Sequence, residues 1–368
     1  MLISQQKITP RFTDLLAVFR KQDQIISSKI VQKYVPNQHL YWTGSGREAL
    51  RQILVGLREE NYRVGIPAFT CHVVLDAVKR AGCLPVFYDS GVIADCNNIK
   101  KIINQVDILI LSYNFGFLPD IKKIAELCKK NKVILIEDCA QALGATYQNK
   151  LTGSFGDYAF YSFGISKNIG FCGGLIGSKK KLLLKKQQSY PLIKLIKVTL
   201  EAIISQLFFN KYLYPFTSKL LKKELTKEQE PLNYKLPNFA KKIILNQFKR
   251  YDQIIEKRRF NANYCIQELT GLINFIRPTL NNNSNQSQDN NPAWLYFTLL
   301  VQNKEQQIHK LLKEEVELGE MSTFQCLGKD NYPKAKEAEN QHLTFALYRS
   351  KKEIKFIVSK IKKALDVI

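Results

Sequence analysis

The chain has 368 residues, and 55 Lys and Arg against 32 Asp and Glu give it a net charge of +23. Hydrophobic residues make up 45% and charged residues 24% of the chain, a composition that is typical of folded rather than disordered proteins. The length is sufficient for two or three domains. Transmembrane and secretory classes are not expected, because no uncharged apolar run reaches roughly 18 residues and the first 20 residues lack a signal-peptide pattern.

Cysteine and histidine are scattered rather than clustered. The eight cysteines form no CxxC pair and the four histidines no HxxxH pair. We therefore do not expect a structural metal site, which needs closely spaced ligands. We also do not expect a disulfide framework, which is typical of short secreted chains. Single cysteines are typical of a reducing compartment, which predicts a cytoplasmic protein.

More than half of the excess positive charge lies between residues 179 and 259, where 20 Lys and Arg stand against six Asp and Glu. Such a region could attract a phosphorylated substrate or an anionic membrane surface, or it could be a solvated face. No helix-turn-helix, RNP or zinc-finger pattern accompanies the charge, so a nucleic acid partner is not expected.

From about residue 60 to 178, short apolar runs alternate with helical patterns. Helices are expected over Thr70–Ala81 and over Asp120–Asn131, the second with Asp120 as its N-cap. Uninterrupted apolar strands separated by helices indicate a mostly parallel sheet with helices on both faces. The expected strands are Tyr62–Pro67, Leu84–Asp89, Asp107–Ser112, Lys132–Glu137, Tyr158–Phe163 and Gly174–Gly177.

The pattern changes after Ser178. Residues 189–216 predict an amphipathic, mildly basic helix whose aliphatic face fits either an anionic membrane surface or the core of a dimer. Further expected elements are a long helical period over Phe239–Leu269, a strand over Trp294–Val301, and helices over Lys304–Leu318 and Lys351–Val367. We predict a large domain over 1–235, with 189–235 as an atypical basic insertion, and a smaller α/β domain over 236–368.

Two stretches have the form of ligand-binding turns at the edge of such a sheet. Thr43–Leu50 (TGSGREAL) places a Gly-Ser-Gly turn before a helical segment, and amides at a helix N-terminus bind phosphate. Arg47 could add a charge-assisted contact. Ile136–Ala145 (IEDCAQALGA) places Glu137 and Asp138 at the carboxyl end of a strand, where open α/β sheets bind ligands.

The third stretch, Gly153–Gly177 (GSFGDYAFYSFGISKNIGFCGGLIG), holds a lysine in a glycine-rich turn. Lys167 lies between Ser166 and Asn168 in a stretch with few charged residues, unlike the lysine runs elsewhere in the chain. A desolvated lysine has a lowered pKa and can form a Schiff base with a carbonyl group. Taken alone, the same pattern also fits an exposed turn lysine.

Together these stretches resemble the DegT/DnrJ/StrS family of PLP-dependent sugar aminotransferases over 42–178. TGSGREAL resembles the SGTxAL phosphate turn of that family, and YNFGFLPD resembles its HxYGxPxD. The long run IEDCAQALGATYQNKLTGSFGDYAFYSFGISKN resembles IEDAAHALGAxYxGKxxGxxGDxxxFSFxxxKN in both order and spacing. The resemblance implies a fold-type-I enzyme with a large, mostly parallel seven-stranded sheet domain and a smaller C-terminal α/β domain.

The resemblance also implies the cofactor, pyridoxal 5′-phosphate (PLP), and the residues that hold it. Lys167 would form a Schiff base with PLP and then carry the proton. Asp138 would pair with the pyridine nitrogen and keep it protonated. Gln141 would contact the 3′-oxygen of the ring. Ser162, together with the backbone at Gly46 and Arg47, would hold the phosphate.

Four features depart from the family pattern, and one of them is that the turn GFCGG after Lys167 lacks the usual acidic residue of the family. Arg47 stands where the family has Thr in the phosphate turn. Cys71 occupies the position at which an aromatic side chain often stacks on the ring, so His72 either takes that role or is structural. The family segment that reaches into the partner subunit is not recognisable, and residues 189–235 stand in its place.

The function that the resemblance implies is transfer of an amino group, from L-glutamate, to a keto sugar linked to a nucleoside diphosphate, by a homodimer. Such enzymes serve surface polysaccharide or related glycan synthesis. Two alternatives are a PLP-dependent sugar dehydratase and a non-catalytic regulatory protein with the same fold. Lys167 disfavours the dehydratase, in which histidine replaces the lysine. The set of Asp138, Gln141, Ser162 and Lys167 disfavours the regulatory protein, which needs no such residues.

Overall fold

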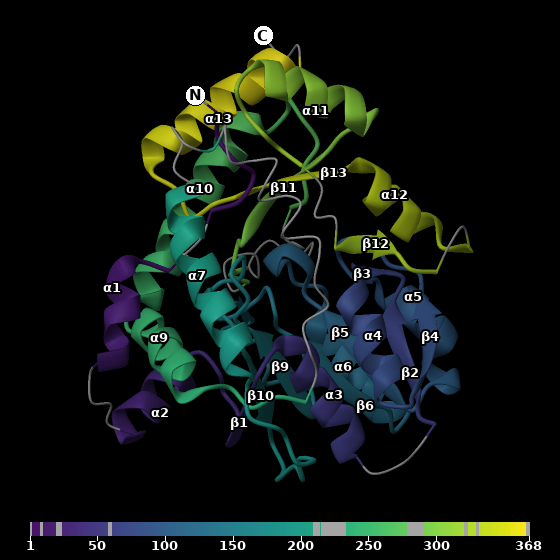
Figure 1. Ribbon diagram of the computed structural model, residues 1–368. Helices are drawn as coiled ribbons and strands as arrows, with labels where there is room; N and C mark the ends of the chain where they lie inside the picture. Colours follow the sequence, from purple (N-terminus) through teal and green to yellow (C-terminus); the bar gives the residue numbers. More distant parts are fainter. Residues whose placement is uncertain are drawn as a thin grey trace.

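The computed structural model describes residues 2–7, 10–19, 24–57, 61–208, 214, 233–277, 290–319, 323–328 and 331–365. Its largest element is a seven-stranded sheet in the order β1-β10-β9-β6-β5-β2-β4, which lies in the lower half of Figure 1. The five strands β9, β6, β5, β2 and β4 are parallel, and β10 pairs antiparallel with both β9 and the edge strand β1. The strands are β1 (His39–Thr43), β2 (Arg63–Pro67), β4 (Leu84–Tyr88), β5 (Ile108–Ser112), β6 (Ile134–Asp138), β9 (Tyr158–Ser162) and β10 (Gly174–Ser178). The mostly parallel seven-stranded sheet that the sequence predicts is confirmed.

Helices cover both faces of this sheet because the side chains of its central strands alternate between two hydrophobic cores. Along β5, Leu109 and Leu111 lie in one core while Ile108 and Ile110 lie in the other. The first core is closed by α5 (Cys96–Ile102), α6 (Ile121–Lys130) and α9 (Asn238–Phe248), among others. The second core is closed by α3 (Gly46–Gly56) and α4 (His72–Arg80). A strand buried on both faces has to be apolar at every position, which is why these runs showed no alternation.

Local capping sets the ends of the helices that were expected. Asp120 caps α6, its carboxylate accepting the Lys123 N–H at 3.3 Å. The chain leaves α4 through Gly82, whose φ of +78° is a conformation that glycine adopts without steric cost. The helical pattern over Phe239–Leu269 is interrupted, however. It forms α9 and α10 (Tyr251–Leu269), and Arg250, at the break, forms an ion pair with Asp14 at 2.5 Å.

The C-terminal part, at the top of Figure 1, packs around a third hydrophobic core to which Phe69, Phe115 and Phe117 of the large domain also contribute. Its strands β11 (Tyr296–Leu300) and β13 (His342–Ala346) pair antiparallel. Its helices are α10, α11 (Lys304–Lys313), α12 (Pro333–Gln341) and α13 (Lys351–Ala364). The helix expected to reach Leu318 ends at Lys313, because Glu315 is left-handed (φ 63°) and Val316 then pairs with Ile3.

Several contacts join this part to the large sheet domain, two of them through backbone hydrogen bonds. β12 (Phe324–Cys326) pairs antiparallel with β3 (Phe69–Cys71), which directly precedes α4. The N-terminal residues 2–7 lie against the C-terminal part, with the Ala346 N–H donating to the Gln5 carbonyl at 2.9 Å. The division into 1–235 and 236–368 stays a prediction.

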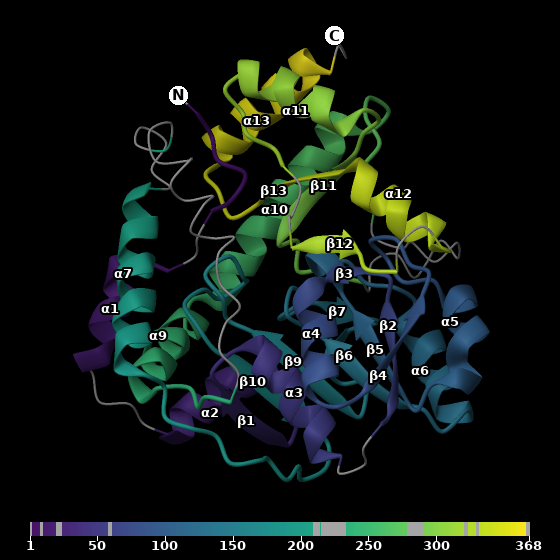
Figure 2. The ribbon, with the colours of Figure 1, turned by 45° about the vertical axis from the view of Figure 1, so that its right-hand side comes forward.

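The amphipathic helix expected over 189–216 is present as α7 (Leu192–Phe208), and residues 209–213, 215 and 216 lie outside the described part of the chain. α7 lies beside α1 (Phe12–Leu15) at one edge of the molecule, as Figure 2 shows. An apolar groove of about 370 Å³ runs between them and α9. Leu195, Thr199 and Leu200 line this groove, whereas Leu192 and Ile193 lie outside it and are 69% and 83% exposed.

The aliphatic face of α7 therefore points largely outward. Among the residues that the structure describes, no helix is both long and apolar enough to cross a membrane. Contact of this face with a membrane surface or with a dimer partner stays a prediction.

At the start of α13, the half-buried carboxylate of Glu353 contributes to the stability of the C-terminal part through its charge. The Ser350 N–H donates to the Glu353 carboxylate at 2.9 Å, and Lys7 lies 3.5 Å from it. Burial acts to raise the pKa of Glu353, but the charges of Lys7 and Arg349 and the Ser350 hydrogen bonds outweigh it and lower the pKa to about 2. A carboxylate with a lowered pKa stabilises the fold above its unfolded pKa of about 4.3, and this stabilisation is lost as pH falls toward 2.

We expect Glu353→Gln to lower the free energy of unfolding by about 1–2 kcal/mol at pH 7 and by about half as much at pH 3. Urea unfolding of both proteins at the two pH values measures the difference. Glu337→Gln, at an exposed position of α12, is the control and should change stability by less than about 0.5 kcal/mol. An equal loss for Glu353→Gln at both pH values would contradict the assignment.

Candidate functional site

Four of the predicted site residues meet at the carboxyl edge of the sheet. Asp138 ends β6 and Ser162 ends the neighbouring strand β9. Lys167 lies in the turn that follows β9, and Gly46 begins α3, which packs against β9 and β10. Adjacent parallel strands end at one edge, so residues distant in the sequence come together there.

Asp138 is a buried carboxylate that is 9% exposed. Its Oδ1 accepts the Ala140 N–H at 3.0 Å, and its Oδ2 accepts the Ser112 hydroxyl at 3.3 Å. Burial raises the pKa of Asp138; the Ala140 N–H, the charge of Lys167 and the Ser112 hydroxyl act in the opposite direction without overcoming burial. Lys167 and Asp138 are thus close enough to interact electrostatically, and the carboxylate would be further stabilised by a second cation.

The neighbouring Glu137 points to the other side of the strand and serves the fold. It is fully buried, and its carboxylate accepts the Tyr113 hydroxyl at 2.6 Å. Three backbone N–H groups also donate to it, those of Gly153 at 2.7 Å, Phe155 at 2.8 Å and Gly156 at 2.6 Å. The two acidic residues of the IEDC stretch therefore have different roles.

The turn that holds Lys167 is closed at its base by backbone hydrogen bonds. The Phe163 N–H donates to the Gly173 carbonyl at 2.9 Å, and the Phe171 N–H donates to the Phe163 carbonyl at 2.7 Å. Within the turn the Lys167 N–H donates to the Gly164 carbonyl at 2.9 Å. Lys167 is half-buried. Its side chain is therefore held on a short, closed loop rather than on a free surface turn.

The N-terminus of α3 forms a tightly packed cradle against β9 and β10. Ser45 caps the helix by accepting the Glu48 N–H at 3.1 Å. A Cβ on Gly46 would lie 2.6 Å from the Ser162 Cβ, and one on Gly174 would lie 2.3 Å from the Ser45 carbonyl oxygen. Only glycine allows this approach of the backbone to Ser162, which brings the positive end of the α3 dipole to the sheet edge.

The side chain of Arg47 turns away from this cradle. Its guanidinium lies 3.3 Å from the Asp76 carboxylate on α4. A contact of Arg47 with an anion at the cradle would therefore come from its backbone amide, unless the ion pair with Asp76 opens.

Gln141 follows β6 and faces the chain after β5. Its Oε1 accepts the Phe115 N–H at 2.5 Å, and Phe115 has a left-handed φ of 58°. The Nε2 of Gln141 is buried and has no hydrogen-bond partner within the described residues. A buried donor without a partner is costly, so an acceptor atom of a ligand would satisfy it.

Cys71 and His72 lie where β3 leads into α4. The His72 N–H donates to the Thr323 carbonyl at 3.0 Å, and its Nδ1 lies 3.3 Å from the same oxygen. Cys71 is half-buried and packs against the core of the C-terminal part. In the described part of the chain no hydrogen bond or ion pair joins either residue to Lys167 or Asp138. Stacking by His72 stays a prediction.

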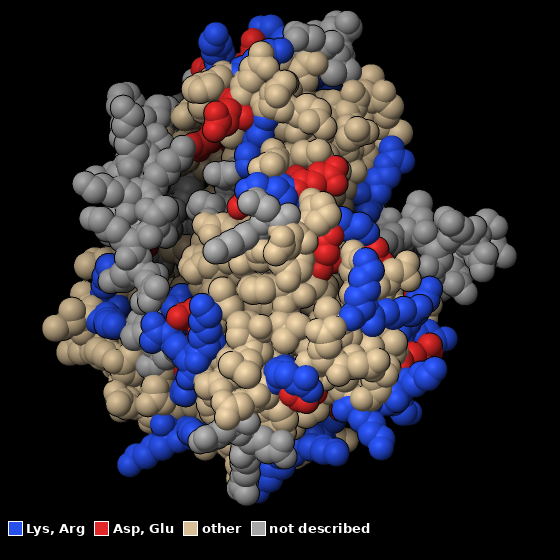
Figure 3. Space-filling view, turned by 90° about the vertical axis from the view of Figure 1, so that its right-hand side faces the viewer, with Lys and Arg blue, Asp and Glu red and all other residues tan. Residues whose placement is uncertain are grey.

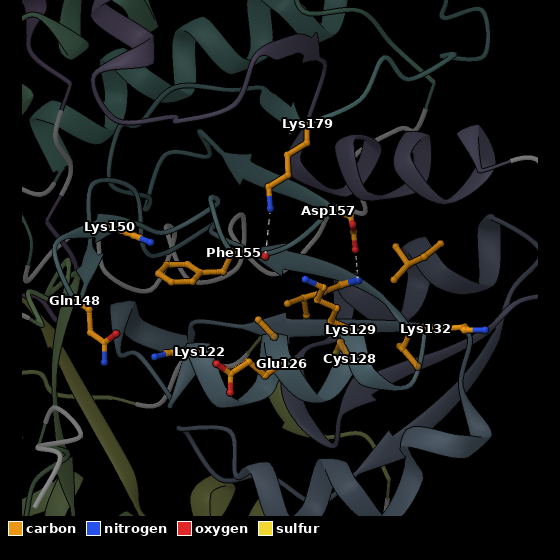
Figure 4. A pocket seen from close by; sticks show the side chains of 14 residues that line it. Lys122, Glu126, Cys128, Lys129, Lys132, Gln148, Lys150, Phe155, Asp157 and Lys179 are labelled. Carbon is orange, nitrogen blue, oxygen red and sulfur yellow. Dashed lines mark hydrogen bonds between the residues drawn. The ribbon is translucent and has the colours of Figure 1, made fainter.

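A basic hollow of the described structure is separate from this site. It has a volume of about 720 Å³ and lies between α6 and the amino end of β6, near Ile134 and Leu135 (Figure 4). Five lysines line it, namely Lys122, Lys129, Lys132, Lys150 and Lys179. On the face shown in Figure 3, Lys and Arg are also more widespread than Asp and Glu over the lower half. The hollow lies at the sheet edge opposite Asp138, so its charge does not form the candidate site.

Sequence reasoning missed three residues that contact the Lys167 turn. Gln247 of α9, Arg258 of α10 and Tyr296 of β11 all form hydrogen bonds to it. Polar residues inside apolar helical or strand patterns were the available signal. Nothing in the local sequence indicates which distant segment such residues contact.

Comparison with known proteins places this geometry in a family. The model of the DegT/DnrJ/EryC1/StrS aminotransferase family matches residues 28–356. A GDP-perosamine synthase of Escherichia coli O157:H7 is 30% identical over 166 residues, which are 42% of this chain and 45% of that protein. A 3-oxo-glucose-6-phosphate:glutamate aminotransferase of Bacillus subtilis is 27% identical over 168 residues, 43% of this chain and 36% of that protein. The chain thus matches less than two thirds of the length of either relative.

Among solved structures, the fold is similar to that of Helicobacter pylori PseC, described as an aminotransferase of pseudoaminic acid biosynthesis. The TM-score is 0.75 at 15% identity, and the match covers 100% of each chain. The family model covers both the sheet-edge site and the C-terminal part. This chain therefore belongs to the DegT/DnrJ/EryC1/StrS aminotransferase family.

Proposed function

We propose that this protein is a PLP-dependent aminotransferase that transfers an amino group from L-glutamate to a keto sugar linked to a nucleoside diphosphate. Its product would serve surface polysaccharide or related glycan synthesis. The observation that carries the proposal is that Asp138, Ser162 and the turn of Lys167 lie at the sheet edge where α3 begins. The names of the two relatives support a sugar substrate, and one of them names glutamate.

The residues present fit PLP on four separate points. The glycine-built cradle at Gly46 suits a phosphate group. The unpartnered Nε2 of Gln141 suits an oxygen on the ring. The buried Asp138 carboxylate suits a protonated ring nitrogen, because a cation offsets the cost of burying its charge. The amine of Lys167 suits the aldehyde group.

When bound, PLP supplies an electron-accepting ring that stabilises negative charge on the substrate carbon. Asp138 would keep the ring nitrogen protonated. Ser162 and the first amides of α3 would anchor the phosphate. Lys167 would move the proton at the reacting carbon as a general acid and base, a role worth about 10²–10⁴-fold in rate. The net charge of +23 would raise the local concentration of a diphosphate-bearing substrate.

We further infer a homodimer located in the cytoplasm. Family membership supports the dimer, and the exposed aliphatic side chains of α7 provide apolar surface for it. The eight cysteines are all free, and six of them are buried, which supports a reducing compartment.

The absorbance spectrum of the purified protein with PLP tests the activity. We expect a visible band of the bound cofactor that is lost on addition of L-glutamate and returns with 2-oxoglutarate. Lys179→Ala, at the opposite edge of the sheet, is the control and should behave like the wild type. A protein that binds no PLP, or one whose spectrum does not respond to L-glutamate, would favour a regulatory role. A response to a keto-sugar nucleotide without any amino donor would favour a dehydratase.

A further inference from the structure

The turn that holds Lys167 accepts hydrogen bonds from three buried polar side chains that lie outside the large sheet. Each contacts a different residue next to the lysine, namely Ser166, Asn168 and Gly170. The three side chains are those of Tyr296, Arg258 and Gln247, each 1% exposed or less. They come from β11, α10 and α9, so the loop carrying the lysine is held by segments about 80–130 residues away in the sequence.

Gln247 holds the end of the turn by a two-point contact. Its Nε2 donates to the Gly170 carbonyl at 2.8 Å, and its Oε1 accepts the Gly170 N–H at 3.2 Å. On the other side of the lysine, the Tyr296 hydroxyl donates to the Ser166 carbonyl at 3.3 Å. Both contacts use backbone atoms of the turn and would therefore restrict its conformation directly.

Arg258 contacts the residue that directly follows Lys167. Its Nη1 donates to the Asn168 Oδ1 at 2.5 Å, and its Nη2 lies 3.4 Å from the Asn168 carbonyl oxygen. Both residues are 1% exposed. Burial lowers the pKa of Arg258, and no Asp or Glu of the described chain forms an ion pair with it. The ring of Tyr348 lies 5.9 Å from its guanidinium carbon.

Burying a guanidinium without a carboxylate partner costs more free energy than burying an apolar side chain at the same place. Desolvating an ion costs several kcal/mol unless partners repay it, and an apolar side chain of similar size avoids that cost. Arg258 differs from such a side chain by its two hydrogen bonds to Asn168 and by its interaction with the Tyr251 hydroxyl, and only the Asn168 contacts reach the Lys167 turn. The rigid fork of arginine fits two oxygens of one residue better than a lysine would.

We propose that Arg258 is a positioning residue for Lys167, its guanidinium fixing Asn168 and thereby the turn from which the lysine amine reaches the cofactor. The inference deepens the proposed function and rests on it for the role of Lys167. Covalent chemistry requires the reacting atoms to be placed closely, and a displacement of about 1 Å can cost about 10²-fold in rate. Loss of the Arg258 contacts should therefore slow reactions of Lys167 more than it weakens binding.

The first test follows capture of Lys167 by PLP in the cofactor-free protein. The amine bonds to the aldehyde carbon with loss of water, and borohydride then reduces the product to a stable secondary amine that mass spectrometry quantifies over time. We expect Arg258→Met to slow this capture about 10- to 100-fold. Arg258→Lys should recover part of the loss, because it keeps the charge and one hydrogen bond but not the fork.

Arg349→Met is the matched control for the structural cost of losing a buried arginine. Arg349 is 3% exposed and donates to backbone oxygens, including Gln6 O at 3.1 Å, but it does not contact the Lys167 turn. Arg349→Met should lower the stability of the protein without slowing the capture of Lys167 by PLP, when all proteins are compared well below their unfolding temperatures. Equal slowing by Arg349→Met and Arg258→Met, or wild-type capture in Arg258→Met, would overturn the proposal.

The second test does not depend on the cofactor. Amide hydrogen exchange of the cofactor-free protein should be faster over residues 164–170 in Arg258→Met, and unchanged there in Arg349→Met. Unchanged exchange in Arg258→Met would also overturn the proposal. If the wild type is never modified at Lys167, the proposed function fails instead, and hydrogen exchange still decides whether Arg258 holds the turn. With an active enzyme, a fall in kcat at a nearly constant KM for L-glutamate would support positioning.

Discussion

Replacement of Lys167 by alanine is expected to lower the rate of amino transfer by at least about 10²–10⁴-fold. The loss combines the missing proton carrier with the missing covalent anchor for the cofactor. Lys167→Arg should not restore the rate, because a guanidinium stays protonated and cannot bond to an aldehyde at neutral pH. Single-turnover measurements with PLP-loaded protein and L-glutamate give the rate directly.

Two further measurements make the Lys167 result specific. Lys167→Ala should still bind PLP without a covalent bond, because Gly46, Ser162, Gln141 and Asp138 remain in place. Lys179→Ala, which removes an exposed lysine from the opposite edge, should keep the wild-type rate. A Lys167→Ala rate within tenfold of the wild type, with unchanged circular dichroism, would remove the lysine from the mechanism.

Replacement of Glu137 by alanine is expected to lower the free energy of unfolding by about 3–5 kcal/mol, the largest stability effect that we predict. The change would leave four donors without their acceptor inside the core, namely the Tyr113 hydroxyl and the N–H groups of Gly153, Phe155 and Gly156. Buried donors that lose an acceptor have no water to replace it. Denaturant unfolding monitored by circular dichroism measures the change.

A second substitution separates charge from hydrogen bonding at this position. Glu137→Gln keeps one acceptor oxygen but presents an NH₂ group to some of the donors, so its loss should be smaller than that of alanine. Glu126→Ala, at an exposed position of α6, should change stability by less than about 0.5 kcal/mol. A Glu137→Ala protein within 1 kcal/mol of the wild type would show that the loop 153–156 finds other acceptors.

Glu137 and Asp138 show which features of the site could be predicted from the sequence and which could not. Their position at the end of an apolar run predicted correctly that one strand would carry both to the sheet edge. The alternation of side chains along a strand places them on opposite sides, but the pattern does not say which side faces a ligand. That depends on the loop 153–156, which comes to Glu137 only in the folded chain.

The amphipathic helix α7 is a second case in which the sequence predicts an element but not what its side chains contact. Its period and its aliphatic residues were evident in the sequence, and the helix formed as expected. The direction of its aliphatic face was not evident, because hydrophobic spacing does not reveal whether the neighbouring segments cover that face. In the structure Leu192 and Ile193 are exposed, while Leu195 lines the groove.

By itself, the sequence predicted the mostly parallel sheet, the turn at Gly46 and the glycine-rich turn that holds Lys167. These follow from signals within a few residues, namely strand period, helix caps and glycine-rich turns, together with the rule that parallel strands end at one edge. Only the tertiary structure decided that Gln247, Arg258 and Tyr296 grip the lysine turn. Such contacts join segments about 80–130 residues apart, and their partners are set by how the whole core packs rather than by any local pattern.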